Sequence, residues 1–208
     1  MKIAIIGASA GIGLETTRLA LEHGHDVTTL SRRTVPRPDQ AKLRRVQGSA
    51  TNPNDVKAAV EGADTVLVTL GVKSSFATTL FSDSARILLQ TIREMGSSPT
   101  LIVLTGFGAG DSWGYNSFPV KLLFTLLLKA VYADKNEQEQ LVAGGYPRWE
   151  IVRPGRLTSG AMTGHYRVLD NLEEGMRVGA ISRADVAHFM VAQAENPTYL
   201  GKYPALTY

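Results

Sequence analysis

The sequence predicts an α/β fold, a single domain built on a doubly wound, mostly parallel sheet. Two observations predict it. Short β-branched runs alternate with longer segments of helical periodicity, and a chain of 208 residues is long enough to bury one substantial core. Because crossovers between parallel strands are right-handed, this alternation winds helices onto both faces of the sheet. We therefore expect residues 1–208 to form one domain.

Strands and helices are expected to follow one another regularly along the chain. The six predicted central strands are Lys2–Ile6, Asp26–Leu30, Leu43–Val46, Thr65–Leu70, Thr100–Leu104 and Trp149–Val152. The predicted helices between them are Gly11–His23, Pro53–Glu61, Leu80–Met95 and Lys121–Val142. A capping pattern, Ser182-x-x-Asp185, opens a further helix to Glu195, and Lys202–Tyr208 reads as a closing strand. The least regular stretch, Ser159 to Ile181, is the candidate substrate-covering region, around residues 157–181.

Composition is that of an ordinary globular protein, with 44% hydrophobic and 20% charged residues. The absence of cysteine excludes disulfides, thiolate nucleophiles and cysteine-ligated metal sites, and it suits a reducing compartment. Met1-Lys2 leads directly into a short apolar strand without a signal-peptide pattern, so we expect a cytoplasmic location. The apolar stretch Phe118–Val131 is interrupted by Lys121 and Lys129 and is shorter than the ~20 residues that span a bilayer, which favours core or protein contact over a membrane.

A glycine-rich turn follows the first strand. It reads Gly7-Ala8-Ser9-Ala10-Gly11-Ile12-Gly13 and leads straight into helical sequence. In this context Gly7 permits a sharp exit from the strand, Gly11 lets the backbone approach a pyrophosphate, and Gly13 lets the helix lie close to the sheet. The helix N-terminus adds free N–H donors and a positive dipole end. The turn predicts dinucleotide binding, against the alternative of a tight connection that binds nothing.

A basic cluster follows the second strand and supplies much of the formal net charge of +3. Its members are Arg32, Arg33, Arg37, Lys42, Arg44 and Arg45. At this position an acidic residue binds the adenine ribose 2′-OH of NAD(H), whereas arginine accommodates the 2′-phosphate of NADP(H). The strand ends in Arg32 and Arg33, with no carboxylate before Asp39, so NADP(H) is the expected cofactor and a nucleic-acid partner is disfavoured. The alternative is a solvated basic turn.

A candidate acid lies on the helix after the fifth strand. No tyrosine is followed four residues later by lysine, but Tyr132 and Lys135 are three apart and share one helical face. They are the candidate catalytic residues, with a surface polar pair as the alternative. His165 in the candidate lid could also donate a proton. His23 and His25 flank Gly24 at a helix end, where the helix dipole explains them, and no metal site is expected.

Several segments together resemble the atypical short-chain dehydrogenase/reductase group of NAD(P)H-binding proteins that includes biliverdin-IXβ reductase, also called flavin reductase. The segments are Gly7 to Gly13, Val27 to Arg32, Ala63 to Gly71, Lys135 to Leu141, Arg153-Pro154-Gly155, Met162 to Tyr166, Ile181 to Met190 and Tyr203-Pro204. The resemblance covers almost the whole chain and implies a Rossmann-like fold.

The resemblance also assigns cofactor-binding roles by position. It implies that Gly7 to Gly13 hold the pyrophosphate, Arg32 the 2′-phosphate, and Leu70-Gly71 the ribose region. Thr105 is expected on the nicotinamide side. The residues expected along the nicotinamide amide are Pro154, Gly155, Arg156 and Leu157. Two departures stand out: Gly48-Ser49 replaces an aspartate usual beside adenine, and Thr105-Gly106 replaces a Thr-Ser pair.

The expected function is hydride transfer from NADPH to a flavin, a quinone or a similar aromatic small molecule. With few side-chain acids, the protein would act mainly as a template that orients cofactor and acceptor. A redox sensor or scaffold that binds NADP(H) without turnover is the alternative from a different class. A sugar-nucleotide epimerase or dehydratase is disfavoured by the short length and the absent tyrosine motif. The chain is expected to act as a monomer or homodimer.

Overall fold

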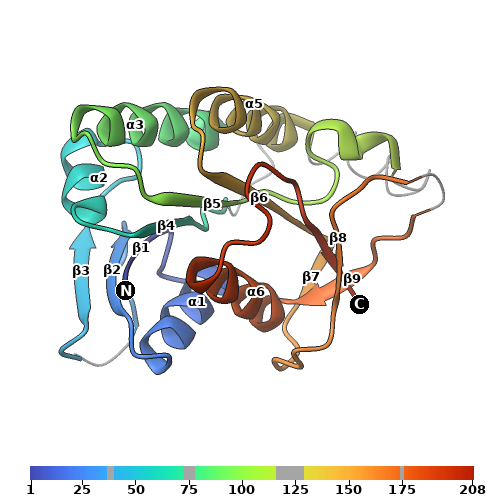
Figure 1. The fold of residues 1–208 in the computed structure, drawn as a ribbon, viewed down its shortest axis with the longest axis horizontal. Helices are drawn as coiled ribbons and strands as arrows, with labels where there is room; N and C mark the ends of the chain where they lie inside the picture. The colour runs from blue at the N-terminus through green and yellow to red at the C-terminus, as the bar shows by residue number, and fades with distance from the viewer. Residues whose placement is uncertain (37–39, 73–77, 116–128, 174–175) are drawn as a thin grey trace.

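A computed structural model describes residues 1–36, 40–72, 78–115, 129–173 and 176–208. Its main sheet has eight strands in the order β3-β2-β1-β4-β5-β6-β10-β8 (Figure 1). They are β1 (Lys2–Ile6), β2 (Asp26–Ser31), β3 (Leu43–Gln47), β4 (Thr65–Val68), β5 (Thr100–Leu104), β6 (Trp149–Pro154), β8 (Arg167–Leu169) and β10 (Ala205–Thr207). Neighbouring strands run parallel except for β8, which is antiparallel to β10. The predicted α/β class and doubly wound sheet are confirmed.

Helices cover both faces of this sheet (Figure 1). On one face lie α1 (Gly11–Glu22) and α6 (Arg183–Glu195). On the other lie α2 (Pro53–Val60), α3 (Leu80–Glu94) and α5 (Lys129–Gly145). Successive side chains of β1 point to opposite faces of the sheet and pack in both helical layers. Ile3 and Ile5 pack toward α1 and α6, whereas Ala4 and Ile6 pack toward α2 and α3.

The strand order creates a crevice. From β1 the chain builds outward to β2 and β3, and then returns to place β4 on the other side of β1. In open α/β sheets, ligands bind at such a switch point, outside the carboxyl ends of the strands. Here the turn after β1 begins at Gly7, and Thr69 and Leu70 follow β4. The fold therefore brings the glycine turn to the expected binding edge.

The region after β6 contains more regular structure than the sequence indicated. There β7 (Arg156–Thr158) pairs in parallel with β9 (Ala180–Ser182) as a separate two-stranded sheet. Before β6, a short 3-10 helix, η1 (Gly110–Tyr115), follows β5. β8 also falls within the stretch expected to be irregular. The closing strand is only Ala205–Thr207, although Lys202 O and Pro204 O before it also accept hydrogen bonds from β6.

Part of one predicted helix lies outside the described residues. The expected helix Lys121–Val142 is seen as α5 from Lys129 to Gly145, so its expected start is not covered, and the same holds for most of the apolar stretch Phe118–Val131. Across the described ranges, every helix is too short or too polar to cross a membrane.

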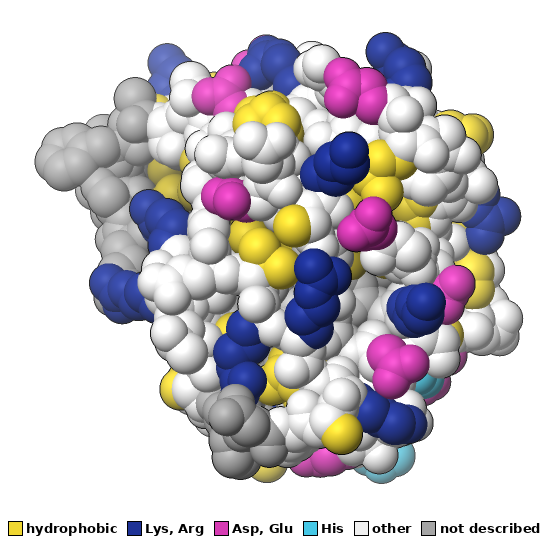
Figure 2. Space-filling view, turned by 90° about the vertical axis from the view of Figure 1, so that its left-hand side faces the viewer, with side chains coloured by type: hydrophobic (Ala, Val, Ile, Leu, Met, Phe, Trp, Pro, Cys, Tyr) yellow, Lys and Arg dark blue, Asp and Glu magenta, His cyan; other side chains and the backbone are white. Residues whose placement is uncertain are grey.

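The β3 edge of the sheet carries mixed charge. Arg44 is exposed on this edge strand. Figure 2, which views the molecule from this side, shows Lys and Arg side chains interspersed with Asp and Glu. Charged side chains on an edge strand disfavour pairing with a strand of another chain.

Candidate functional site

The glycine turn requires glycine at two of its three positions for steric reasons. Gly7 has a φ of +99°, and a Cβ there would lie 2.8 Å from the carbonyl carbon and oxygen of Thr69. A Cβ on Gly13 would lie 2.3 Å from the Gly7 oxygen. These contacts hold α1 tightly against the ends of β1 and β4. Gly11 is different: the nearest atom to an added Cβ is Arg183 Cδ, at 3.9 Å, so the space above it is open.

The N-terminus of α1 lacks a side-chain cap. Ala10 occupies its N-cap position, and no side chain there accepts a hydrogen bond. By contrast, Asn52 accepts from two N–H groups at the start of α2, and Ser182 accepts from Asp185 N at the start of α6. The first N–H groups of a helix need partners, and an anion can supply them. Open space over Gly11 and uncapped donors fit a pyrophosphate.

The rest of the turn is arranged around this opening. Ala8 and Ile12 are buried and anchor the turn in the core, Ser9 is half-buried, and Ala10 is exposed beside Gly11. A hollow next to it is lined by Gly11, Leu14, Glu15, Arg18, Ser159, Gly160, Ala161, Met162, Arg183 and Ala184. A second hollow lies at the amino ends of β1 and β2, at the opposite edge of the sheet. Only the first adjoins the predicted site.

Arg32 and Arg33 lie at the same edge as the glycine turn. Gly7 N donates to Leu30 O at 2.8 Å, which joins the end of β2 to the turn. Both arginines are exposed, and Ser31 Oγ donates to Arg33 O at 2.6 Å, which fixes the backbone between them. Among the described residues no acidic side chain forms an ion pair with either arginine. Two guanidinium groups are thus available to an anionic ligand.

The backbone N–H of Ser49 donates a hydrogen bond to a carboxylate that the sequence did not indicate. Asp55, on α2, accepts a hydrogen bond from Ser49 N at 2.9 Å. A Cβ on Gly48 would lie 2.4 Å from the Asp55 carboxyl, so Gly48 makes room for this side chain. A carboxylate from α2 therefore lies beside the turn after β3, which itself has no aspartate. Its signal was the capping segment Asn52-Pro53, which places Asp55 in the first turn of the helix.

Thr105, the residue that follows β5, is held by a buried network of ion pairs and hydrogen bonds. Thr105 Oγ1 donates to Glu139 at 2.7 Å. Glu139 in turn accepts from Arg153 at 2.6 Å, and Arg153 also bonds Asp111 at 2.6 Å. Both Glu139 and Arg153 are buried. The Thr105 hydroxyl hydrogen is therefore used inside the protein, and the network ties β5, α5 and β6 together.

Tyr132 and Lys135 converge on Gly106, directly after β5. A Cβ on Gly106 would lie 2.8 Å from Tyr132 Oη and 3.8 Å from Lys135 Nζ. Lys135 Nζ donates to Thr105 O and lies 5.2 Å from the Phe81 ring centroid. The phenol thus occupies the space beside the turn where a Thr-Ser pair would place a serine side chain.

The two side chains have shifted acidities. Burial lowers the pKa of Lys135 to about 8, although the negative charge of Glu139 opposes the shift. Burial, together with the charge of Glu139, raises the pKa of Tyr132 to about 12. At neutral pH the phenol therefore keeps its proton and can donate it.

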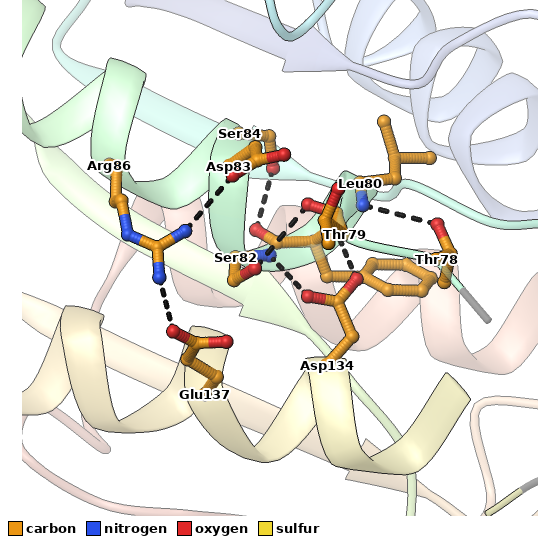
Figure 3. A network of polar contacts seen from close by, with 10 residues as sticks. Thr78, Thr79, Leu80, Ser82, Asp83, Ser84, Arg86, Asp134 and Glu137 are labelled. Carbon is orange, nitrogen blue, oxygen red and sulfur yellow. Dashed lines mark hydrogen bonds and ion pairs between the residues drawn. The ribbon is translucent and has the colours of Figure 1, made fainter. Parts of the chain in front are cut away.

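Asp134, between these two residues, sets the position of α5. Its carboxylate accepts from Phe81 N at 2.9 Å and from Ser82 N at 3.0 Å, and so caps α3 from a neighbouring helix (Figure 3). Arg86 and Glu137 form a second bridge between the same helices (Figure 3). These contacts fix the rotation of α5 and hence the direction of Tyr132 and Lys135.

The remaining predicted residues line the same edge. Leu70 is half-buried, and the space around Gly71 is open. Pro154 is buried at the end of β6, and Phe107 N donates to its oxygen at 2.9 Å. Arg156 is exposed and Leu157 half-buried. A Cβ on Gly155 would lie 2.3 Å from Gly179 O, so glycine is needed where β7 meets β9.

The candidate lid is anchored by Asp185, at the start of α6. It accepts from Thr163 N and Gly164 N, both at 2.8 Å, and from Tyr208 Oη at 2.6 Å. Against the opposing effect of burial, these hydrogen bonds hold the pKa of Asp185 below its ordinary value. Arg183 donates to Thr158 O at 2.9 Å above Gly11. The sequence pattern indicated the cap but not this cation over the glycine turn.

Comparison with known proteins assigns the family. Residues 7–197 match a family described as NAD(P)H-binding. The chain belongs to this NAD(P)H-binding family. The match spans the glycine turn, the crevice and α6, so the resemblance expected from the sequence is confirmed.

Solved structures repeat the same fold. ChuY, an anaerobillin reductase from Escherichia coli O157:H7, is 25% identical with a TM-score of 0.82, covering 100% of this chain and 97% of that one. SP1627, a proposed NADH-flavin reductase from Streptococcus pneumoniae TIGR4, is 20% identical with a TM-score of 0.80, covering 100% and 99%. A short-chain dehydrogenase/reductase from Veillonella parvula in complex with NADP is 15% identical with a TM-score of 0.84, covering 100% and 94%.

A curated relative matches only in part. A 3-beta-hydroxysteroid dehydrogenase from Mycolicibacterium neoaurum is 35% identical over 71 residues, which is 34% of this chain and 19% of that protein. The chain thus spans about a fifth of that relative's length.

Proposed function

We propose that the protein is an NADPH-dependent reductase that transfers hydride to a planar aromatic acceptor, such as a flavin, a quinone or a linear tetrapyrrole. The observation that carries the proposal is the convergence of Tyr132 and Lys135 on Gly106, at the same sheet edge as the open glycine turn. A dinucleotide-binding crevice alone suits a sensor equally well. A protonated phenol beside it gives a reason to favour turnover.

The chain's own residues would bind and orient the cofactor. The N–H groups of the Gly7 to Gly13 turn and of α1 would hold the pyrophosphate. Arg32 and Arg33 would bind the 2′-phosphate with charge-assisted hydrogen bonds, which favours NADP(H) over NAD(H). Ser49 lies beside Asp55, on the side where adenine would bind. When bound, the nicotinamide supplies a hydride.

The acceptor takes up one hydride and one proton. We propose that Tyr132 Oη donates the proton to the oxygen or nitrogen that gains negative charge, since its pKa of about 12 keeps it protonated. The phenolate is then reprotonated from solvent. Lys135 lies close enough to Tyr132 to stabilise that anion, with its Nζ 5.5 Å from the ring centroid. The rest of the rate advantage would come from orientation.

The comparisons support a reductase of this kind. One structural neighbour is an anaerobillin reductase and another is a proposed NADH-flavin reductase. The region 157–181, held by Asp185, would cover the proposed acceptor.

Steady-state oxidation of NADPH tests the proposal. Purified protein is mixed with NADPH and, in turn, FMN, FAD, biliverdin and a simple quinone, and the loss of NADPH absorbance is followed. We expect turnover with at least one acceptor. Tyr132→Phe should lower kcat for the quinone or biliverdin about tenfold or more with little change in the KM for NADPH. Tyr146→Phe is the matched control, because Tyr146 hydrogen-bonds Pro99 O away from the crevice.

The outcomes separate the alternatives. Tight NADPH binding without turnover across the whole acceptor panel would favour the sensor. Turnover that Tyr132→Phe leaves unchanged would restrict the protein to a template role and remove the acid from the mechanism.

A further inference from the structure

Two histidines and a glutamate meet on the side of the molecule where α1 ends. His23 Nδ1 lies 2.8 Å from Glu195 Oε1, and His25 Nε2 lies 2.7 Å from the same oxygen. One ligand atom from each residue lies within 4.8 Å of the other two. The histidines come from the turn between α1 and β2, and Glu195 is the last residue of α6.

The backbone fixes the two histidines in place. Gly24 has a φ of +81°, His25 N donates to Ala20 O at 3.0 Å, and Gly24 N donates to Leu21 O at 3.0 Å. This is the glycine-terminated helix ending known as the Schellman motif. The turn therefore presents both imidazoles to one side independently of any ligand, and α6 brings Glu195 to meet them.

The hydrogen bonding in this cluster is crowded. A carboxylate oxygen only accepts, so both imidazole nitrogens must carry hydrogens and donate to a single Oε1. Against partial burial, these bonds hold the pKa of Glu195 below its ordinary value. A cation between the three atoms would satisfy them equally well, with each nitrogen then presenting its lone pair.

We propose that His23, His25 and Glu195 form a binding site for a divalent transition metal ion, with zinc as the best-fitting case. Imidazole nitrogen and carboxylate oxygen are the donors that zinc takes in sites with three protein ligands and one water. In a tetrahedral zinc site the ligand atoms lie about 3.3 Å apart, so each imidazole would move about half an ångström away from Glu195. The two imidazole nitrogens, which lie within 4.8 Å of each other, would take up the same spacing. The exposed fractions of His23 and Glu195, 39% and 36%, leave an approach from solvent.

The charges around the cluster permit such binding. Lys42 is held at the turn by a hydrogen bond from its Nζ to Gly24 O, at 2.6 Å. Glu22, at the end of α1, is paired with Arg18. The carboxylate of Glu195 supplies the negative charge that a divalent ion requires.

A metal at this site would act on structure and not on hydride transfer. The glycine turn is at the N-terminus of α1 and the cluster is at its C-terminus, about 18 Å away for a helix of 12 residues. The ion would join the end of α1 to the end of α6, the two helices that cover one face of the sheet. Its binding should therefore raise thermal stability and leave NADPH binding unchanged.

Zinc titration of the untagged full-length chain tests this site. Isothermal titration calorimetry in a buffer that does not bind zinc should show one saturable site per chain. His25→Ala and Glu195→Gln should each weaken zinc affinity at least tenfold. His165→Ala is the matched control, because His165 is an exposed histidine outside the cluster, and it should change the affinity less than twofold.

Thermal unfolding gives a second readout. Zinc should raise the Tm of the wild type, since a ligand that binds only the folded state stabilises it, and this increase should be lost in Glu195→Gln. Circular dichroism establishes that each variant is folded. No saturable zinc binding, or equal affinity in the wild type and Glu195→Gln, would overturn the proposal.

Discussion

At two turns of the crevice, a glycine leaves room for a side chain from a neighbouring helix. Gly106 leaves the space that Tyr132 Oη fills, and Gly48 leaves the space that Asp55 fills. In both places the glycine makes room for a polar side chain from a neighbouring helix. A hydroxyl therefore lies beside the turn after β5 and a carboxylate beside the turn after β3, although neither is visible in the local sequence of those turns.

The phosphate specificity rests on two exposed residues. Replacing Arg32 and Arg33 together by alanine should weaken NADPH binding about a hundredfold or more, because each of the two charge-assisted hydrogen bonds contributes about 1.5–3 kcal/mol. Binding of NADH, which lacks the 2′-phosphate, should change little. Fluorescence titration with both cofactors measures the ratio. An equal loss for NADPH and NADH would contradict the assignment.

The predictability of the site differs between its residues. The turn from Gly7 to Gly13 could be predicted because its function needs a contiguous pattern in a strand-turn-helix context. Glu139 and Arg183 could not, because each acts on a residue distant in the chain. The place of Thr105 on the nicotinamide side stays a prediction, and the local sequence did not indicate that its hydroxyl donates to Glu139. A local pattern does not report such long-range pairing.

At the scale of elements, the cap between α5 and α3 links stability to the site. Asp134 caps α3 and lies between Tyr132 and Lys135 in the sequence (Figure 3). A substitution of Asp134 should therefore alter both the stability of the fold and the activity of the site. The hydrogen bond that Asp64 accepts from Lys2 N lies at the amino edge of the sheet, opposite the site, and has no such connection.

Two alanine substitutions separate these effects. Asp134→Ala should lower the free energy of unfolding by about 1–2 kcal/mol and also lower kcat/KM for NADPH, because α5 loses its fixed rotation. Asp64→Ala should cost about 1 kcal/mol of stability, because it removes the acceptor of Lys2 N, and leave kcat/KM nearly unchanged. Urea unfolding and initial rates are the measurements. A loss of activity in Asp64→Ala as large as in Asp134→Ala would contradict the positioning role.

At the scale of the whole molecule, the sheet buries an acid. Glu150 on β6 is 0% exposed, and neither carboxylate oxygen has a hydrogen-bond partner within the described parts of the chain. It lies opposite Ile102 in the parallel register of β5 and β6. Burial raises its pKa to about 8. Near neutral pH the folded protein therefore holds a proton there that the unfolded chain releases.

This proton makes stability depend on pH. Because the folded pKa exceeds the ordinary value of 4.5, the contribution of Glu150 is fully present below about pH 4.5 and is lost as pH rises toward 8. Glu150→Met should remove that loss and be about 2 kcal/mol more stable than the wild type at pH 8. Chemical unfolding at several pH values measures the difference. The same pH slope in both proteins would refute it.

The sheet topology was accessible to sequence reasoning because six strands of four to six residues carry a clear apolar pattern. The strands β7, β8 and β9 have three residues each and pair with distant segments, so nothing in their local sequence distinguishes them from loop. The fold was thus predictable where it holds the cofactor, and less so where it would cover the acceptor.

The position of β10 also orders the assembly of the chain during synthesis. Within the described residues β8 joins the main sheet only through β10, and Tyr208 N donates to Ala180 O in β9. Residues 205–208 emerge from the ribosome after residues 1–204. The strands β1 to β6 can therefore pair while the chain is still being made, whereas β8 must wait for translation to pass β10. The nucleotide-binding half of the crevice matures first, and the half that would meet the acceptor is completed last.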